Sequence, residues 1–74
     1  MIRRMADERA HLVQADRHIQ EAKAHIARQL ELIKKLRKDG HDTDLAESML
    51  DALETTLRAL ERHRDLILDR LGEQ

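Results

Sequence analysis

Three histidines recur at seven-residue intervals in the first half of the chain, and imidazole is a common side chain for proton transfer and metal binding. They are His11, His18 and His25, and each precedes an aliphatic residue. Seven helical residues span about 10 Å, whereas one zinc ion needs ligands at about 2.1 Å. The spacing therefore predicts a half-buried row that flanks a packing seam, each imidazole covering apolar surface.

A second interpretation of this row is a response to pH. Histidine becomes positively charged slightly below neutral pH, so several histidines at one interface would add repulsion on acidification. Glu8 and Glu21 lie within about one turn of histidines in the row and would oppose that repulsion. The sequence leaves the sign of such a response open.

One short motif has the spacing of a metal site. Glu8 and His11 form a Glu-x-x-His pair, as in carboxylate-bridged di-iron bundles, and His63 is the nearest further candidate. A complete site also needs inward carboxylates from the other helices, but Arg70 lies where the second helix would face Glu8. We expect Glu8 to pair with Arg70 or to be simply solvated, and we predict no metal and no cofactor.

Residues suited to nucleophilic catalysis or phosphate binding are scarce. Ser48 is the single serine, Cys is absent, and two glycines cannot build a phosphate-binding loop. A basic cluster occurs at Lys34, Lys35, Arg37 and Lys38, but cations are favoured at any helix C-terminus. The net charge of −1 lacks the basic excess of a nucleic-acid binder. We expect a protein that is not an enzyme and does not bind nucleic acid.

Length and composition define the class. The 74 residues allow one small domain, 1–74, and the absence of Phe, Tyr and Trp limits the area it can bury. Charged residues make up 39% of the chain, which together with strong periodicity and no Pro is typical of long helices. There is no apolar run of about 20 residues and no secretory signal at the start, so we expect a cytoplasmic protein without a membrane segment.

A stop-and-restart signal divides the chain near its middle. Gly40 follows a basic turn and can adopt the left-handed conformation that ends a helix. Asp42, Thr43 or Asp44 can then cap a second helix. We predict helices at about 6–38 and about 43–71, joined by a turn at 39–42.

Both predicted helices carry an apolar repeat of 3.5 residues, which is the coiled-coil pattern. The first, up to Asp39, has ten Lys and Arg against six Asp and Glu, a net charge of +4, and the remainder has four against nine, a net charge of −5. Opposite charges and a short turn favour antiparallel packing. The predicted fold is an all-α, antiparallel two-helix hairpin that resembles a coiled coil. Gln29 and Arg64 interrupt the repeat, and we expect them to fix its register, with Arg64 beside Asp16 or Glu21.

The apolar stripes are broader than a single neighbouring helix can cover. We therefore predict a homodimer in which two hairpins form a four-helix bundle, or a hairpin that binds an unidentified protein partner. The predicted interface residues are Leu12, Ile19, Ile26, Leu30, Ile33, Met49, Leu50, Leu53, Leu57, Leu60 and Ile67.

Residues 25–68 resemble a group of short uncharacterised alphaproteobacterial proteins that are predicted helical hairpins with an RDGHDT-like turn. This chain has RKDGHDT, with one added Lys, and a similar RHRDLIL ending. The resemblance implies a hairpin in a bacterial cytoplasm and brings no catalytic residue, cofactor or partner.

The sequence thus favours a non-enzymatic protein-interaction module, a small adaptor or regulator that acts through a self-associating helical hairpin. The alternatives are a small metal- or ligand-binding helical bundle, and an antitoxin-like or nucleic-acid-associated regulator.

Overall fold

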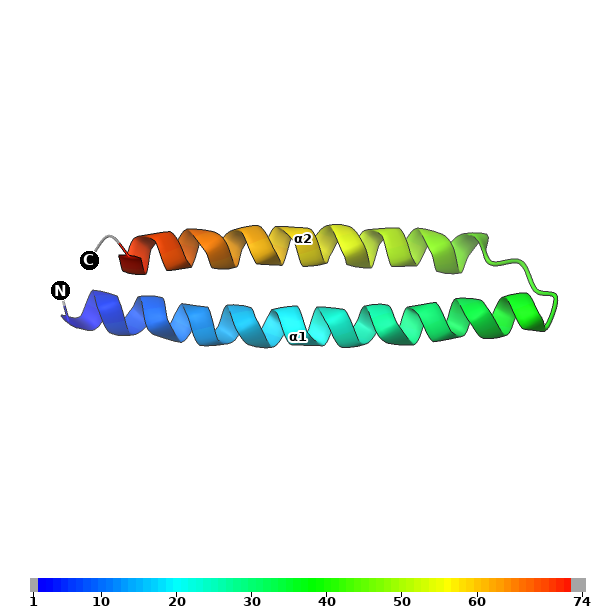
Figure 1. Cartoon of the computed structure of the whole chain (residues 1–74), viewed down its shortest axis with the longest axis horizontal. Coiled ribbons are helices and arrows are strands. Elements are labelled where there is room, and N and C mark those ends of the chain that lie inside the picture. The colour runs from blue at the N-terminus through cyan, green and yellow to red at the C-terminus, as the bar shows by residue number, and fades with distance from the viewer. Residues whose placement is uncertain (1, 73–74) are drawn as a thin grey trace.

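The computed structural model describes the backbone of residues 2–72 and the side chains of residues 7–72. This part of the chain forms two α-helices and no strand: α1, Ile2–Lys38, and α2, Asp44–Gly72. The helices lie side by side and run in opposite directions, with the connecting loop at one end of the rod (Figure 1). The rod measures 58 × 14 × 13 Å. The all-α hairpin predicted from the sequence is confirmed.

The helix bounds follow the local sequence signals closely near the loop. α1 ends at Lys38, where the prediction placed its end, and α2 begins at Asp44, one residue after the predicted start. At the other end α1 begins at Ile2, four residues earlier than predicted. The prediction started the helix with the periodic apolar pattern, but Arg, Met and Ala have high intrinsic helix propensity, so the helix extends beyond that pattern.

The loop begins with a Schellman motif, in which a left-handed residue closes the helix. Gly40 has a φ of 76°, the conformation predicted for it. The backbone N–H of His41 donates to the carbonyl of Leu36 at 2.8 Å, and that of Gly40 donates to Arg37 at 3.2 Å. These bonds satisfy carbonyl groups that the end of α1 would otherwise leave open.

The start of α2 settles which residue occupies the N-cap position. The Thr43 carbonyl accepts the first helical hydrogen bond, from the N–H of Glu47 at 2.8 Å, so Thr43 is the N-cap. Its hydroxyl donates to the Glu47 carboxylate at 3.1 Å, and Asp42 Oδ1 accepts from the N–H of Asp44 at 2.9 Å. Acidic groups here also suit the positive end of the helix dipole.

The core is a narrow seam between the two helices. Its buried apolar residues are Ala15, Ile19, Ala22, Ile33, Ala46 and Ile67. Half of them are alanines, which bury little area, and only Ile67 is almost completely enclosed, with 1% of its surface exposed. A core this small gives a single hairpin marginal stability.

Two polar residues within the seam set the register of the helices, as predicted. Gln29 is buried, and its Nε2 donates to the carbonyl of Ala46 on the other helix at 2.8 Å. Arg64 donates from Nε to Asp16 Oδ1 across the hairpin. Because each partner lies on the opposite helix, sliding one helix along the other would break both interactions.

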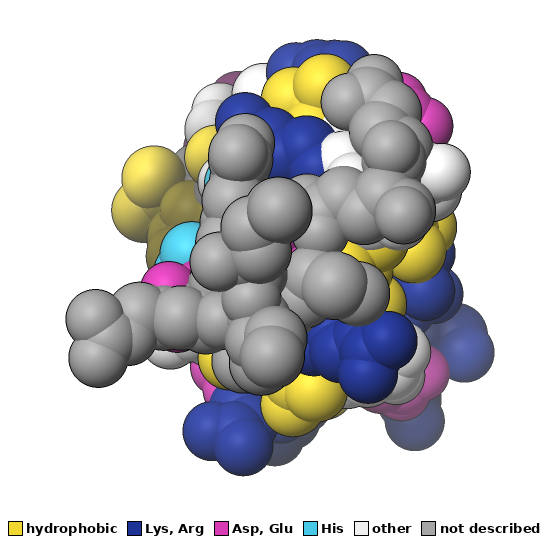
Figure 2. All heavy atoms as spheres, turned by 90° about the vertical axis from the view of Figure 1, so that its left-hand side faces the viewer, with side chains coloured by type: hydrophobic (Ala, Val, Ile, Leu, Met, Phe, Trp, Pro, Cys, Tyr) yellow, Lys and Arg dark blue, Asp and Glu magenta, His cyan; other side chains and the backbone are white. Residues whose placement is uncertain are grey.

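The rest of the surface is mixed. Viewed along the rod, charged side chains project around the circumference and apolar side chains reach the surface between them (Figure 2). Neither helix, over the described residues, has a stretch that is both long and apolar enough to cross a bilayer.

Candidate interaction surface

Two shallow grooves run along one side of the hairpin, between α1 and α2. The groove nearer the loop has a volume of about 460 Å³ and the next about 420 Å³. They are continuous because His25, Arg28, Leu53 and Thr56 line both. We call the lining of both grooves the histidine face; its residues are His18, Glu21, Ala22, Ala24, His25, Arg28, Gln29, Leu32, Met49, Ala52, Leu53, Thr56 and Leu60.

The two walls of the histidine face differ in chemistry. The α2 wall consists of Met49, Ala52, Leu53, Thr56 and Leu60, with no ionisable group among them. Met49 is 51% exposed. The α1 wall instead combines two imidazoles, one carboxylate and one guanidinium with the exposed Leu32 and two alanines. The α2 wall is therefore uncharged, and the α1 wall is mixed.

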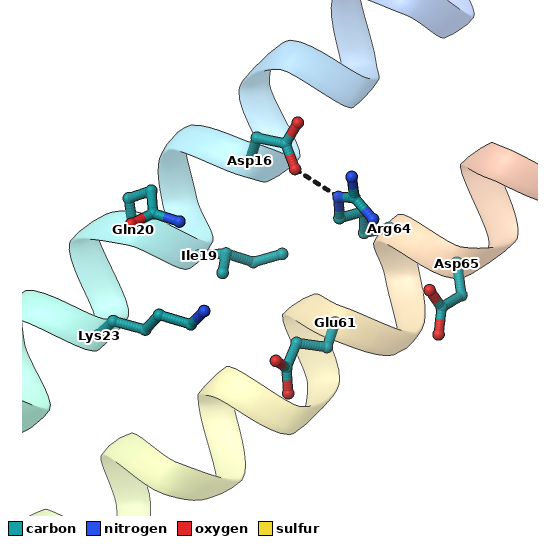
Figure 3. A pocket seen from close by; sticks show the side chains of 7 residues that line it. All are labelled: Asp16, Ile19, Gln20, Lys23, Glu61, Arg64 and Asp65. Carbon is teal, nitrogen blue, oxygen red and sulfur yellow. Dashed lines mark hydrogen bonds and ion pairs between the residues drawn. The ribbon is translucent and has the colours of Figure 1, made fainter.

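A polar pocket of about 480 Å³ lies on a different side of the hairpin (Figure 3). We call its lining, together with Arg37 and Glu47, the ion-pair face; the lining residues are Asp16, Ile19, Gln20, Lys23, Glu61, Arg64 and Asp65. Lys23 and His25 are two positions apart, which places them about 200° apart around the helix. The two faces are therefore on nearly opposite sides of the hairpin.

Cross-helix ion pairs occupy the ion-pair face. Arg64 pairs with Asp16 in the pocket, and Arg37 pairs with Glu47 at 3.1 Å near the loop. Figure 3 shows Lys23 and Glu61 at the same opening, each from its own helix. Two ion pairs on this face thus join the two helices of one chain, whereas Lys23, Glu61 and Asp65 are in no ion pair within residues 7–72.

The predicted interface residues divide between seam and surface. Three are buried in the seam of the single hairpin: Ile19, Ile33 and Ile67. Six are half-buried: Leu12, Ile26, Leu50, Leu53, Leu57 and Leu60. Two are exposed: Leu30, at 50%, and Met49. Of the eleven, Met49, Leu53 and Leu60 line the histidine face.

The expectation that the histidine row is half-buried is wrong for a single hairpin. His11, His18 and His25 are exposed, as are His41 and His63. His18 and His25 lie beside the seam, where they line the grooves, but α2 does not cover them. The described part of one chain therefore leaves the row open to solvent.

The metal candidates do not come together. Glu8 approaches Arg70 at 3.8 Å, as expected, and its side chain is only 13% exposed. Its Oε2 atom is buried without a hydrogen-bond partner among the described residues. No cluster of three or more His, Asp or Glu suited to a metal occurs in residues 7–72, so Glu8, His11 and His63 do not form such a group there.

Several exposed residues were not among the predicted site residues. Leu45 and Leu66 are 76% and 55% exposed, and seven-residue spacing aligns them with Ala52 on the histidine-face side of α2. Glu21 and Arg28 line the α1 wall. Their spacing repeats that of the histidine row, which was the available signal in the sequence.

Comparison of the chain with known protein families, curated proteins and solved structures found no match.

Proposed function

We propose that this hairpin is a non-enzymatic protein-interaction module, a small cytoplasmic adaptor or regulator that acts by self-association. Two copies would join through their histidine faces into a homodimeric four-helix bundle. The observation that carries this proposal is the uncharged α2 wall, where Met49 is exposed and Leu53 and Leu60 are only half-buried along one side. Covering such a wall with another apolar surface lowers the free energy, because apolar side chains are removed from water.

The limited core supports a second copy as the occupant. A 74-residue chain without aromatic residues gains little from its own seam, and a dimer adds a second buried layer. The broad apolar stripe of α2, wider than one neighbour covers, is the pattern of a helix in a bundle. The ion-pair face, which carries two ion pairs between the helices of one chain, is left as the outer surface of the dimer and can carry contacts to other proteins.

A pair of matched substitutions tests the proposal. Ala52 is exposed on the histidine face, and Ala27 is exposed on α1 outside both grooves. Ala52→Asp would bury a charge in the dimer interface, whereas Ala27→Asp has the same intrinsic cost in a helix but stays in water.

Size-exclusion chromatography with light scattering gives the mass. We expect the unmodified chain and Ala27→Asp at twice the 8.7 kDa of one chain, and Ala52→Asp at 8.7 kDa or in a weak equilibrium. Equal masses for the two variants would show that the histidine face is not where copies meet.

A further inference from the structure

On the histidine-face side of α2, the outermost row of residues has the same order of residue types in both directions along the helix. Leu45, Ala52, Ala59 and Leu66 follow one another at seven-residue intervals, and all four are exposed. If a second α2 lies antiparallel on this row, each leucine meets a leucine and each alanine meets an alanine. The small central residues then allow the two helices to approach closely.

In the corresponding row of α1, the two central residues carry opposite charges. The row consists of Gln14, Glu21, Arg28 and Lys35, again seven residues apart. Glu21 and Arg28 lie at equal distances from the row centre, and both are exposed. Neither forms an ion pair within residues 7–72. An antiparallel second α1 would place Arg28 of one copy beside Glu21 of the other, twice.

The two centres lie at the same level of the hairpin. The α1 row is centred beside His25, and the α2 row beside Thr56. Both residues line both grooves, with Arg28 and Leu53 next to them at the point where the grooves meet. A single two-fold axis perpendicular to the rod can therefore pass through both centres. One axis therefore accounts for the order of residues in both rows.

We infer that two copies pack histidine face to histidine face about this axis, with their loops at opposite ends of the bundle. α2 contacts α2 of the second copy, with Leu45 on Leu66 and Ala52 on Ala59. α1 contacts α1 of the second copy, where Glu21 pairs with Arg28. This arrangement rests on the proposed self-association and specifies its geometry.

The other two-fold arrangement, with both loops at the same end, matches the surfaces poorly. There α1 would lie on α2 of the second copy, so Glu21 would face Ala59 and Arg28 would face Ala52. Both charges would lose water without gaining a partner, which is costly. The opposite net charges of the helices do not favour it, because the acidic residues of α2 lie outside the histidine face.

Single cysteines distinguish the two arrangements, because the natural chain has none. A disulfide needs Cα atoms within about 7 Å. In the inferred dimer, the cysteine introduced by Thr56→Cys lies near the two-fold axis, beside the same cysteine of the second copy. We therefore expect mild oxidation to link most chains covalently. With the loops at the same end, the two introduced thiols would be diagonal across the bundle, about 14 Å apart for helix spacings of about 10 Å. Absence of that link in a dimer would overturn the inference.

Mixed cysteine variants give an independent readout. Leu45→Cys and Leu66→Cys chains should each resist self-linking but link to one another when mixed. Lys35→Cys mixed with Leu45→Cys should remain unlinked, since these positions meet only when the loops are at the same end. A strong link between positions 35 and 45 would overturn the arrangement and leave self-association standing. Monomeric chains by light scattering before oxidation would instead refute the proposed function itself.

Charge reversal tests the α1 contact without introducing a crosslink. Glu21→Arg and Arg28→Glu should each raise the dimer Kd about tenfold, since like charges would then face each other. The double variant Glu21→Arg/Arg28→Glu restores opposite charges and should bring the Kd back to within about threefold of the natural value. Circular dichroism controls for helix content. Additive weakening in the double variant would contradict the pairing.

Discussion

The two faces of the hairpin differ in their ion pairs. On the ion-pair face, Arg64 and Asp16, and Arg37 and Glu47, pair across the two helices of one chain. On the histidine face no lining residue forms an ion pair with another described residue, and Glu21 and Arg28 remain exposed beside an uncharged α2 wall. The first face stabilises the hairpin in its own register. The second is the face that we propose a second copy covers.

The difference shows how one seam can support two roles. The ion pairs, with Gln29, specify how α1 lies against α2. Apart from Gln29, the residues of the histidine face form no hydrogen bond or ion pair between the helices within residues 7–72, and we propose that they specify how a second copy is oriented. Substitutions should therefore separate hairpin stability from dimer affinity, according to the face on which they lie.

The largest effect is expected in the seam beneath both faces. Ile67 is 1% exposed, and Ile67→Ala should lower the free energy of unfolding by about 2–5 kcal/mol through lost burial and the cavity left behind. Leu45→Ala is the comparison, since Leu45 is 76% exposed in the hairpin and should matter only for dimer affinity. Urea denaturation of each variant in its monomeric state measures the difference. Similar losses of unfolding free energy for both variants would contradict the distinction between seam residues and face residues.

A smaller effect is expected at the loop, which belongs to neither face. Gly40→Ala forces a side chain into the left-handed region at a φ of 76°, at a cost of about 1 kcal/mol. Nothing lies within 4 Å of the new methyl group, so the cost is conformational and no clash is added. Thermal unfolding should shift downward while the Kd of the folded dimer stays unchanged. A change in Kd would link the loop to the histidine face.

The smallest expected effects come from one matched substitution on each face. Asp16→Asn removes a half-exposed ion pair and should cost about 0.5 kcal/mol of hairpin stability, with no change in dimer Kd. Glu21→Gln should do the reverse, weakening the dimer and leaving the monomer unchanged. Thermal melts and dilution isotherms of both variants, measured in the same buffer, separate the two readouts. Matching behaviour of the two variants would mean that the faces are equivalent.

Much of the hairpin was predictable because local signals agree with the long-range pattern. The seven-residue repeat indicates which residues share a stripe, and Gly40 with its flanking charges indicates where the chain reverses. Those two facts indicate the register well enough to predict that Arg64 lies beside Asp16 or Glu21 and that Glu8 can pair with Arg70. The structure pairs Arg64 with Asp16 and Glu8 with Arg70.

The exposure of the histidine row could not be predicted in the same way. A repeat identifies a row beside the seam, but coverage depends on helix rotation and on side-chain volume in the seam. Both follow only from the packed hairpin, in which Ala15 and Ala22 are buried and the three imidazoles of the row remain in solvent. The repeating order of the α2 row and the opposite charges of the α1 row were present in the sequence. They suggest a shared two-fold axis only once the grooves place His25 and Thr56 at the same level of the hairpin.

Sedimentation equilibrium of the unmodified chain over a dilution series is the direct test of self-association. We expect a reversible shift from twice the mass of one chain toward a single chain as the concentration falls. A molecule of 8.7 kDa at every concentration would contradict self-association, because the histidine face would then need no second copy.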